Sequence, residues 1–194
     1  MELASTTFGQ GFTSTMIQEI SAISAVINGG TYYQPHVVKE IKSQEDGSVL
    51  KTNEGNVLKQ IVSSDVSEKI REYMGMSVTS GTSRKSKVQG YSMGGKTGTA
   101  EILSTKEKDY LVSFIGFAPL DTPQVVVYVV VDRPNVEEQA DSSYAQYIAQ
   151  AILDEILPYM NIYPDEETEE TTKLWDGFKG VLKLDDSEVE VNEP

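Results

Sequence analysis

Residues 94–132 read GGKTGTAEILSTKEKDYLVSFIGFAPLDTPQVVVYVVVD, and this stretch decides the fold class. It contains three strand candidates, which run from Gly94 to Ile102, from Tyr110 to Ala118 and from Gln124 to Asp132. Because the connections between them are short, we expect the strands to form an antiparallel meander. The second and third strands are almost continuously apolar, which is typical of strands covered on both faces. The sequence therefore predicts a sheet that requires helices to cover it.

Two amphipathic segments are candidates for these helices. Between Thr13 and Asn28 the apolar residues recur at helical spacing, with Thr13 or Ser14 suited to cap the start and Gly29-Gly30 suited to end the helix. The second segment runs from Ser143 to Leu157, and the apolar residues of one side are expected to face the sheet: Tyr144, Tyr147, Ile148, Ala151, Ile152 and Ile156. The predicted fold class is α+β, an antiparallel sheet covered by helices.

A hairpin and a further helix are predicted between the first covering helix and the sheet. Residues 36–41 alternate, and Asp46-Gly47 leads into residues 48–50, a pattern that indicates a peripheral hairpin. A helix is expected to begin near Ser64 or Asp65, where Asp65 and Glu68 are spaced as a capping box. Its predicted buried stripe consists of Val66, Ile70 and Met74.

Composition restricts the class of protein. The 194 residues suffice for one domain, and the hydrophobic content of 39% is that of a globular chain. The net charge of −14 argues against nucleic acid or an anionic membrane surface as a partner, because both would be repelled. The chain has no cysteine, which excludes disulfides and thiolate zinc sites. Its longest aliphatic stretch, Val125 to Val131, is far shorter than the roughly 20 residues that span a bilayer.

The charge is concentrated at one end of the chain. Residues 161–194 hold 11 Asp and Glu against 3 Lys, which is −8 of the net charge. Within them, Pro164 to Thr172 reads PDEETEETT and has too little apolar surface to offset its ordering entropy, so we expect a solvated linker. This division predicts a folded part over residues 1–160 and an acidic tail over residues 161–194.

The most informative chemistry lies in Lys96, Thr97, Gly98 and Thr99, at the start of the first strand candidate. A lysine supplies a cation, threonines supply hydroxyl donors for a carboxylate, and glycine lets a ligand lie close to the backbone. Alternation along a strand would place Lys96 and Thr97 on opposite faces. If Lys96 and Thr97 serve one binding site, their strand must lie at the edge of the sheet or bend locally, and the flanking glycines permit such a bend.

Lys-Thr-Gly is a motif of penicillin-binding proteins and serine β-lactamases. Other segments stand around it in a characteristic order: Phe8-Gly9-Gln10-Gly11, then AVINGG at 25–30 and QPHVV at 34–38, with VSFIGFAP at 112–119 after the motif. In this order they closely resemble class B penicillin-binding proteins, the monofunctional cell-wall transpeptidases, over roughly Thr7 to Met160. The resemblance identifies the chain as the C-terminal part of such a transpeptidase domain.

This resemblance implies acyl transfer, in which a serine attacks the penultimate D-alanine of a peptidoglycan stem peptide and penicillins mimic that substrate. Lys96 would support proton movement at the nucleophile and attract the substrate carboxylate, which Thr97 and Thr99 would bind. The backbone N–H of Thr99, after Gly98, would form part of the oxyanion hole. The implied partners are stem peptides, β-lactams and other cell-wall synthesis proteins, with no metal and no cofactor. The implied location is the extracytoplasmic face of the cytoplasmic membrane, although the chain shows no anchor.

The family also requires Ser-x-x-Lys and Ser-x-Asn, both before Lys-Thr-Gly. No Ser-x-Asn occurs in the 194 residues. The one Ser-x-x-Lys, from Ser48 to Lys51, lies beside the predicted turn and too close to Lys96 for a second motif between them, so we interpret it as a chance match. Tyr159-Met160-Asn161 resembles a variant of the second motif but lies after Lys96, and we interpret it in the same way. The chain is therefore expected to be inactive alone and to start within a longer transpeptidase domain.

Two other classes of function remain open at this point. One is a non-catalytic half-domain that binds a cell-wall synthesis partner, and the other is part of a β-lactamase or a β-lactam sensor. Upstream genomic sequence distinguishes truncation from a half-domain, because only truncation predicts the two missing motifs in the same reading frame. The residues that follow Met160 favour a transpeptidase over a β-lactamase, since β-lactamase domains commonly end soon after the last helix.

The remaining polar and aromatic candidates have ordinary explanations. His36 has no cysteine or second histidine as a co-ligand, so we expect a solvated or packed side chain. Asp132-Arg133-Pro134 is interpreted as a plain turn rather than a charge pair. The carboxylates of residues 165–170 lack the spacing and central glycine of a calcium loop. Helical spacing assigns the nearby tyrosines to core packing: Tyr144, Tyr147 and Tyr159.

Overall fold

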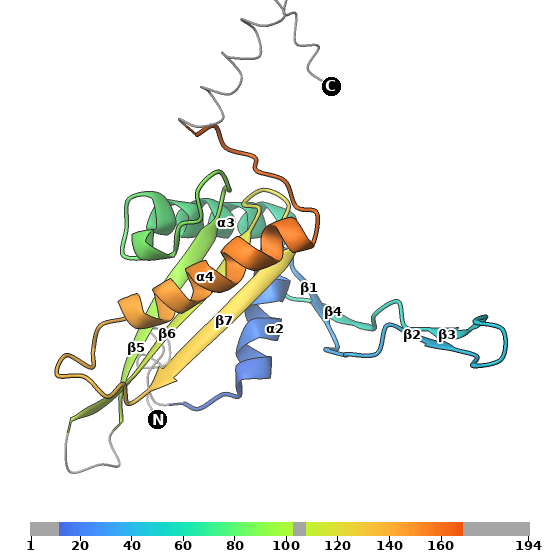
Figure 1. Ribbon diagram of the computed structural model, residues 1–194, viewed down its shortest axis with the longest axis horizontal. Coiled ribbons are helices and arrows are strands. Elements are labelled where there is room, and N and C mark those ends of the chain that lie inside the picture. Colours follow the sequence, from blue (N-terminus) through green and yellow to red (C-terminus); the bar gives the residue numbers. More distant parts are fainter. Residues whose placement is uncertain (1–11, 103–107, 169–194) are drawn as a thin grey trace, which may run out of the picture.

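The computed structural model describes residues 12–102 and 108–168. Strands β5 (Gly94–Ile102), β6 (Asp109–Ala118) and β7 (Val125–Asp132) form a three-stranded antiparallel sheet in the order β5-β6-β7 (Figure 1). The register of β5 on β6 is unbroken from Gly94 opposite Phe117 to Ile102 opposite Asp109. The predicted meander is therefore confirmed, with strand bounds that agree to within one residue.

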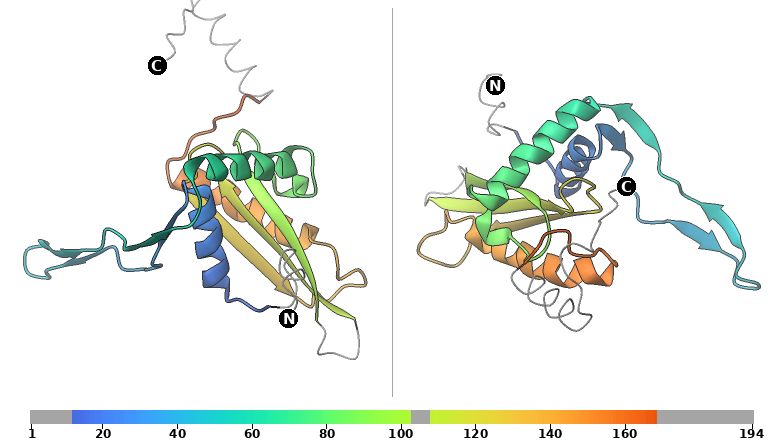
Figure 2. Two further views of the ribbon diagram at one scale, coloured as in Figure 1. Left: turned by 180° about the vertical axis from the view of Figure 1, so that it is seen from behind. Right: turned by 90° about the horizontal axis from the view of Figure 1, so that it is seen from above.

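Helices cover both faces of this sheet. Helices α2 (Met16–Ile27) and α3 (Ser64–Thr79) lie against one face, and α4 (Ser143–Tyr159) crosses the other (Figures 1 and 2). One buried cluster joins α2 and α3 to β6: Ile27, Met74, Ile115 and Phe117. A second joins α4 to β6 and β7: Phe114, Val129, Ala145 and Ala149. The α+β class and the two-sided cover of the apolar strands are confirmed.

The start of α2 differs from the prediction. The capping residue is Thr15 rather than Thr13 or Ser14, because the Thr15 hydroxyl accepts from the N–H of Gln18 while the Gln18 side chain accepts from the N–H of Thr15 at 2.9 Å. This reciprocal pair is a capping box. The predicted end is confirmed, since Gly29 and Gly30 have φ values of 93° and 97° that glycine adopts without strain.

Helix α3 begins at Ser64 as expected, but a different residue caps it. The Ser63 hydroxyl accepts from the N–H of Val66, so the Asp65 to Glu68 capping box was wrong. Val66 is 45% exposed, whereas Met74 is buried and Ile70 packs at the margin of the core. The buried side of α3 is formed by Ser67, Met74, Gly75 and Val78. Ser67 and Gly75 are small and permit close packing.

Helix α4 turns a different face to the sheet from the predicted one. Tyr147, Ile148 and Ile152 are 52%, 46% and 37% exposed. The buried residues are instead Ser143, Ala145, Gln146, Ala149, Leu153 and Leu157. A helix with apolar residues on several sides does not reveal its buried face by periodicity alone. The alanines decide the orientation, because small side chains allow the helix to lie close to β6 and β7.

The hairpin projects away from the layered body. Strands β2 (Glu40–Lys42) and β3 (Val49–Thr52) pair with each other, and every residue in them is exposed. At its base, β1 (Thr31–Tyr33) pairs with β4 (Val57–Gln60) (Figure 1). The Ser48 hydroxyl donates to Asp46 at 2.7 Å within the turn, and this bond together with the Ser48 N–H lowers the pKa of the Asp46 carboxyl. The predicted peripheral hairpin is confirmed.

Exposed apolar side chains lead to a prediction about association. They lie at the start of α2, on the outer side of α4 and on the hairpin: Met16, Ile17, Ile148, Ile152 and Leu50. Exposed apolar surface favours self-association. We expect the average mass of the isolated chain in light scattering to rise with concentration, and Ile148→Glu with Ile152→Glu to reduce that rise. A concentration-independent monomer mass would contradict this prediction.

Candidate functional site

Strand β5 carries all four residues singled out by the sequence: Lys96, Thr97, Gly98 and Thr99. It is an outer strand of the described sheet, with β6 on one side and no described strand on the other. Its pairing with β6 contains no bulge, and the expected edge strand is present among the described residues. The four residues therefore share one straight, open strand edge.

The cation of this strand is available to a ligand. Lys96 is exposed, and its Nζ donates to the carbonyl oxygen of Thr97 at 2.7 Å. Across residues 12–102 and 108–168, no carboxylate lies within ion-pair distance of Lys96. A substrate carboxylate can displace a neutral carbonyl partner at little cost, because a charged acceptor makes the stronger hydrogen bond.

Hydroxyl groups accompany the lysine. Thr99 is exposed, and Thr97 is half-buried with its Oγ1 3.3 Å from Oγ1 of Thr82. Thr82 follows α3 and was not predicted as a site residue. The only sequence signal was its place in the Gly/Ser/Thr-rich loop before the strand. The structure thus places Lys96, Thr97 and Thr99 along β5 and brings the Thr82 hydroxyl next to that of Thr97.

The glycines of this stretch have a packing role that differs from the expected one. A Cβ added to Gly94 would lie 2.2 Å from the ring of Phe117, and one added to Gly95 would lie 2.5 Å from the ring of Phe114. A Cβ on Gly98 would lie 2.6 Å from the Ser113 hydroxyl of β6. These glycines allow β5 to lie against bulky side chains of β6. Close packing within the fold thus favours glycine at these positions, and the expected role of Gly98 in the approach of a ligand stays a prediction.

The pockets beside α2 are not part of the β5 strand edge. Two cavities of about 380 and 570 Å³ lie beside α2, and no β5 residue lines either of them. Ser48 lies on the projecting hairpin, which supports the interpretation of its Ser-x-x-Lys sequence as a chance match. Asn161 has φ 59° and ends α4, so Tyr159-Met160-Asn161 has a structural role there.

Several minor expectations are corrected by the structure. Asp132 and Arg133 do form an exposed ion pair at 2.9 Å, although Arg133 also occupies a turn with φ 48°. Tyr147 and Tyr159 are exposed rather than packed in the core, and the Lys85 ammonium lies 5.7 Å from the Tyr147 ring centre. His36 contacts the carbonyl of Gln34 at 3.2 Å. Within the described residues, no cluster of three metal-ligating side chains is present, and no helix has the length and apolar character to cross a membrane.

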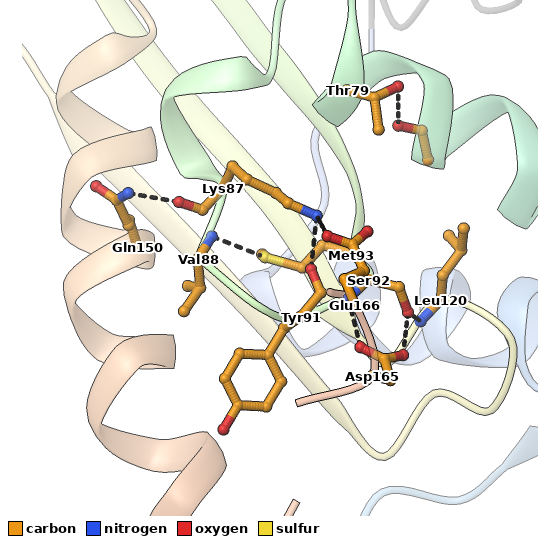
Figure 3. A network of polar contacts seen from close by, with 11 residues as sticks. Thr79, Lys87, Val88, Tyr91, Ser92, Met93, Leu120, Gln150, Asp165 and Glu166 are labelled. Atoms are coloured by element: carbon orange, nitrogen blue, oxygen red, sulfur yellow. Dashed lines mark hydrogen bonds and ion pairs between the residues drawn. The ribbon is translucent and has the colours of Figure 1, made fainter. Parts of the chain in front are cut away.

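The segment after α4 also departs from the prediction. Asp165 and Glu166, expected in a solvated linker, contact residues just before β5 (Figure 3). Residues 169–172 of that linker lie outside the described part of the chain. The division of the chain at residues 160 and 161 therefore stays a prediction.

Comparison with known proteins agrees with this architecture. The transpeptidase domain of Burkholderia pseudomallei penicillin-binding protein 3 superposes with a TM-score of 0.69 and 26% identity, over 84% of this chain and 48% of that one. Stage V sporulation protein D of Bacillus subtilis is 38% identical over 184 residues, and the peptidoglycan D,D-transpeptidase MrdA of Acinetobacter baumannii is 31% identical over 143 residues. The fold is thus that of penicillin-binding transpeptidase domains.

Residues 1–154 match the family model described as the penicillin binding protein transpeptidase domain, and the chain belongs to this family. The resemblance inferred from the motifs is confirmed. The match covers 93% of this chain but 28% of the sporulation protein, and 66% of this chain but 21% of the D,D-transpeptidase. The chain therefore spans less than a third of the length of these curated relatives.

Proposed function

We propose that this chain supplies one wall of the active site of a serine D,D-transpeptidase that cross-links peptidoglycan stem peptides and binds penicillin. The observation that carries the proposal is the exposed Lys96 on the open edge of β5, with threonine hydroxyls beside it, in a chain of the transpeptidase family. A cation and hydroxyl donors on a strand edge suit an extended peptide with a terminal carboxylate. A penicillin carries a carboxylate of the same kind.

The residues of β5 have separate roles in this proposal. Lys96 attracts the carboxylate and supports proton transfer at the nucleophile, while Thr97 and Thr99 donate hydroxyl hydrogen bonds to the carboxylate. The backbone N–H of Thr99 helps to stabilise the oxyanion of the tetrahedral intermediate. Pairing with β6 holds this N–H at a set position before the substrate binds, so little reorganisation is required during the reaction.

The nucleophile is proposed to come from a part of the protein outside these 194 residues. Acylation requires a serine with a base within hydrogen-bond reach. The Ser48 hydroxyl donates to Asp46 on an exposed hairpin, and the buried Ser86 hydroxyl donates to the Ser83 carbonyl oxygen. Neither setting activates a nucleophile at β5. The length of the curated relatives leaves ample room for the missing motifs.

Location and partners follow the same proposal. A cross-linking enzyme meets its substrate outside the cytoplasmic membrane, so we place the whole protein on the extracytoplasmic face, in contact with stem peptides and other cell-wall synthesis proteins. The net charge of −14 is consistent with the absence of nucleic acid among these partners.

Covalent labelling by a fluorescent penicillin tests the proposal. We expect no labelling of the chain of residues 1–194, because its sequence has no Ser-x-Asn and its one Ser-x-x-Lys lies on the exposed hairpin. The full-length protein should be labelled with one penicillin per molecule at a serine outside this chain. Heat-denatured full-length protein is the control for nonspecific acylation.

The labelling pattern separates the alternatives. Stoichiometric labelling at any serine of residues 1–194 would show that the chain contains a complete site. It would contradict the proposal that the nucleophile lies outside this chain. A folded full-length protein that remains unlabelled would instead favour a non-catalytic binding module.

A further inference from the structure

The segment after α4 is bound to the loop that leads into β5. We define the strap as residues 161–166 and the approach loop as residues 87–93. The Asp165 carboxylate accepts the Ser92 N–H at 2.6 Å through Oδ1 and the Ser92 hydroxyl through Oδ2 (Figure 3). Both oxygens of one carboxylate therefore hold one residue, two positions before β5 begins at Gly94.

Backbone contacts fix the register of the strap on the approach loop. The N–H groups of Asp165 and Glu166 both donate to the Gly90 carbonyl, at 2.9 and 3.0 Å. Gly90 has φ 82°, a conformation that favours glycine, and a Cβ there would lie 3.3 Å from Pro164. The approach loop is thus shaped to receive the strap closely.

A buried anchor holds the other end of the strap. Ile162 and Tyr91 belong to one buried cluster with α4, and the Tyr91 hydroxyl donates to the Ile162 carbonyl at 3.1 Å. Burial raises the pKa of the Tyr91 phenol, and the carboxylates of Asp154 and Asp165 add to this shift. The phenol therefore remains protonated and able to donate at physiological pH.

Ser92 connects three parts of the fold. Its hydroxyl donates to Asp165 and accepts the N–H of Leu120 at 2.9 Å, in the connection between β6 and β7. Met93, which follows it, is buried and accepts the N–H of Val88 through its sulfur at 3.3 Å. Since β5 pairs with only one described strand, this junction is a second restraint on the position of its first residues.

We propose that Asp165 is a positioning residue for the reaction, which acts through Ser92 on the placement of β5. The inference rests on the proposed function and extends it to a residue after α4. A small shift of β5 displaces the backbone N–H of Thr99, which has no side-chain freedom to compensate. The long side chain of Lys96 adjusts to the same shift by rotation about its bonds. Loss of the hydrogen bonds between Asp165 and Ser92 therefore impairs acylation more than carboxylate binding.

The test is single-turnover penicillin acylation in the full-length protein, separated into an initial dissociation constant and a first-order acylation rate. Asp165→Ala should lower the acylation rate about tenfold and change the dissociation constant by less than about twofold, as expected for loss of geometry in the transition state. Asp165→Asn keeps an acceptor for the Ser92 N–H and should recover most of the rate. A lower acylation rate with a nearly unchanged dissociation constant, and recovery of the rate in Asp165→Asn, distinguish positioning from general destabilisation.

Glu166→Gln is the matched control within the strap. The Glu166 carboxylate pairs with Lys87 at 2.6 Å, whereas the carboxylate that binds Ser92 is that of Asp165. This variant should keep the wild-type acylation rate. Equal loss of rate in Glu166→Gln and Asp165→Ala would overturn the inference, as would a wild-type rate in Asp165→Ala.

Amide hydrogen exchange over residues 92–99 gives a readout that does not depend on acylation. Exchange should be faster in Asp165→Ala than in wild type and Glu166→Gln, and unchanged exchange would overturn the inference. If wild-type protein is not acylated, the proposed function fails. The exchange result still decides whether the hydrogen bonds between Asp165 and Ser92 restrain β5.

Discussion

Lys96→Ala in the full-length protein is expected to lower the second-order rate of penicillin acylation by about 100- to 1,000-fold. The substitution removes the cation that we propose attracts the carboxylate and supports proton movement at the nucleophile, so two losses should compound. Because Lys96 is exposed and bonded only to the Thr97 carbonyl among the described residues, the fold should not suffer. Stopped-flow acylation measures the rate, and the unfolding midpoint checks the fold.

Two companion variants refine this test. Lys96→Arg keeps the charge but replaces a compact ammonium with a planar fork, so it should recover carboxylate attraction better than proton transfer and part of the rate. Thr99→Val removes a hydroxyl and retains the backbone N–H, which predicts a milder loss than that of Lys96→Ala. A near wild-type rate for Lys96→Ala, in folded protein, would show that β5 is not the active-site strand.

The second large effect is expected where β5 meets β6. Phe117 is fully buried and lies directly opposite Gly94 in the register. Phe117→Ala should lower the free energy of unfolding of the transpeptidase domain by about 3–5 kcal/mol, the usual cost of removing a buried phenylalanine ring. Gly94→Ala should cost about 1–3 kcal/mol, because its Cβ would overlap the ring of Phe117. Chemical denaturation of the full-length protein measures both values.

The double variant tests the cause of these losses. Once the ring is gone, the Cβ of Gly94→Ala has space, so the double variant should be less destabilised than the sum of the single variants by at least about 0.5 kcal/mol. Ala100→Val, at an exposed position of the same strand, is the control and should change stability by less than about 0.5 kcal/mol. Additive losses would mean that the ring does not restrict Gly94.

Much of the sheet was predictable because its signals are local. Continuous apolar runs located β6 and β7 to within one residue, and Gly29-Gly30 located the end of α2. The same signals misassigned the residues that cap α2 and α3, because adjacent hydroxyl and carboxylate residues compete to cap a helix. Propensity alone does not rank Thr13, Ser14 and Thr15, since the choice depends on how the preceding chain approaches the helix.

The sequence by itself determined the α+β class, the order of the strands and the presence of a Lys-Thr-Gly motif on the first of them. Each of these depends on residue types at short spacing. Only the tertiary structure decided which side of α4 is buried, because Ala145 and Ala149 permit close approach to the sheet while longer side chains do not. It alone brought Asp165 to Ser92, which lies 73 residues earlier in the chain. Hydrogen bonds between distant polar groups leave no periodic pattern, since they exist only after packing has brought the two segments together.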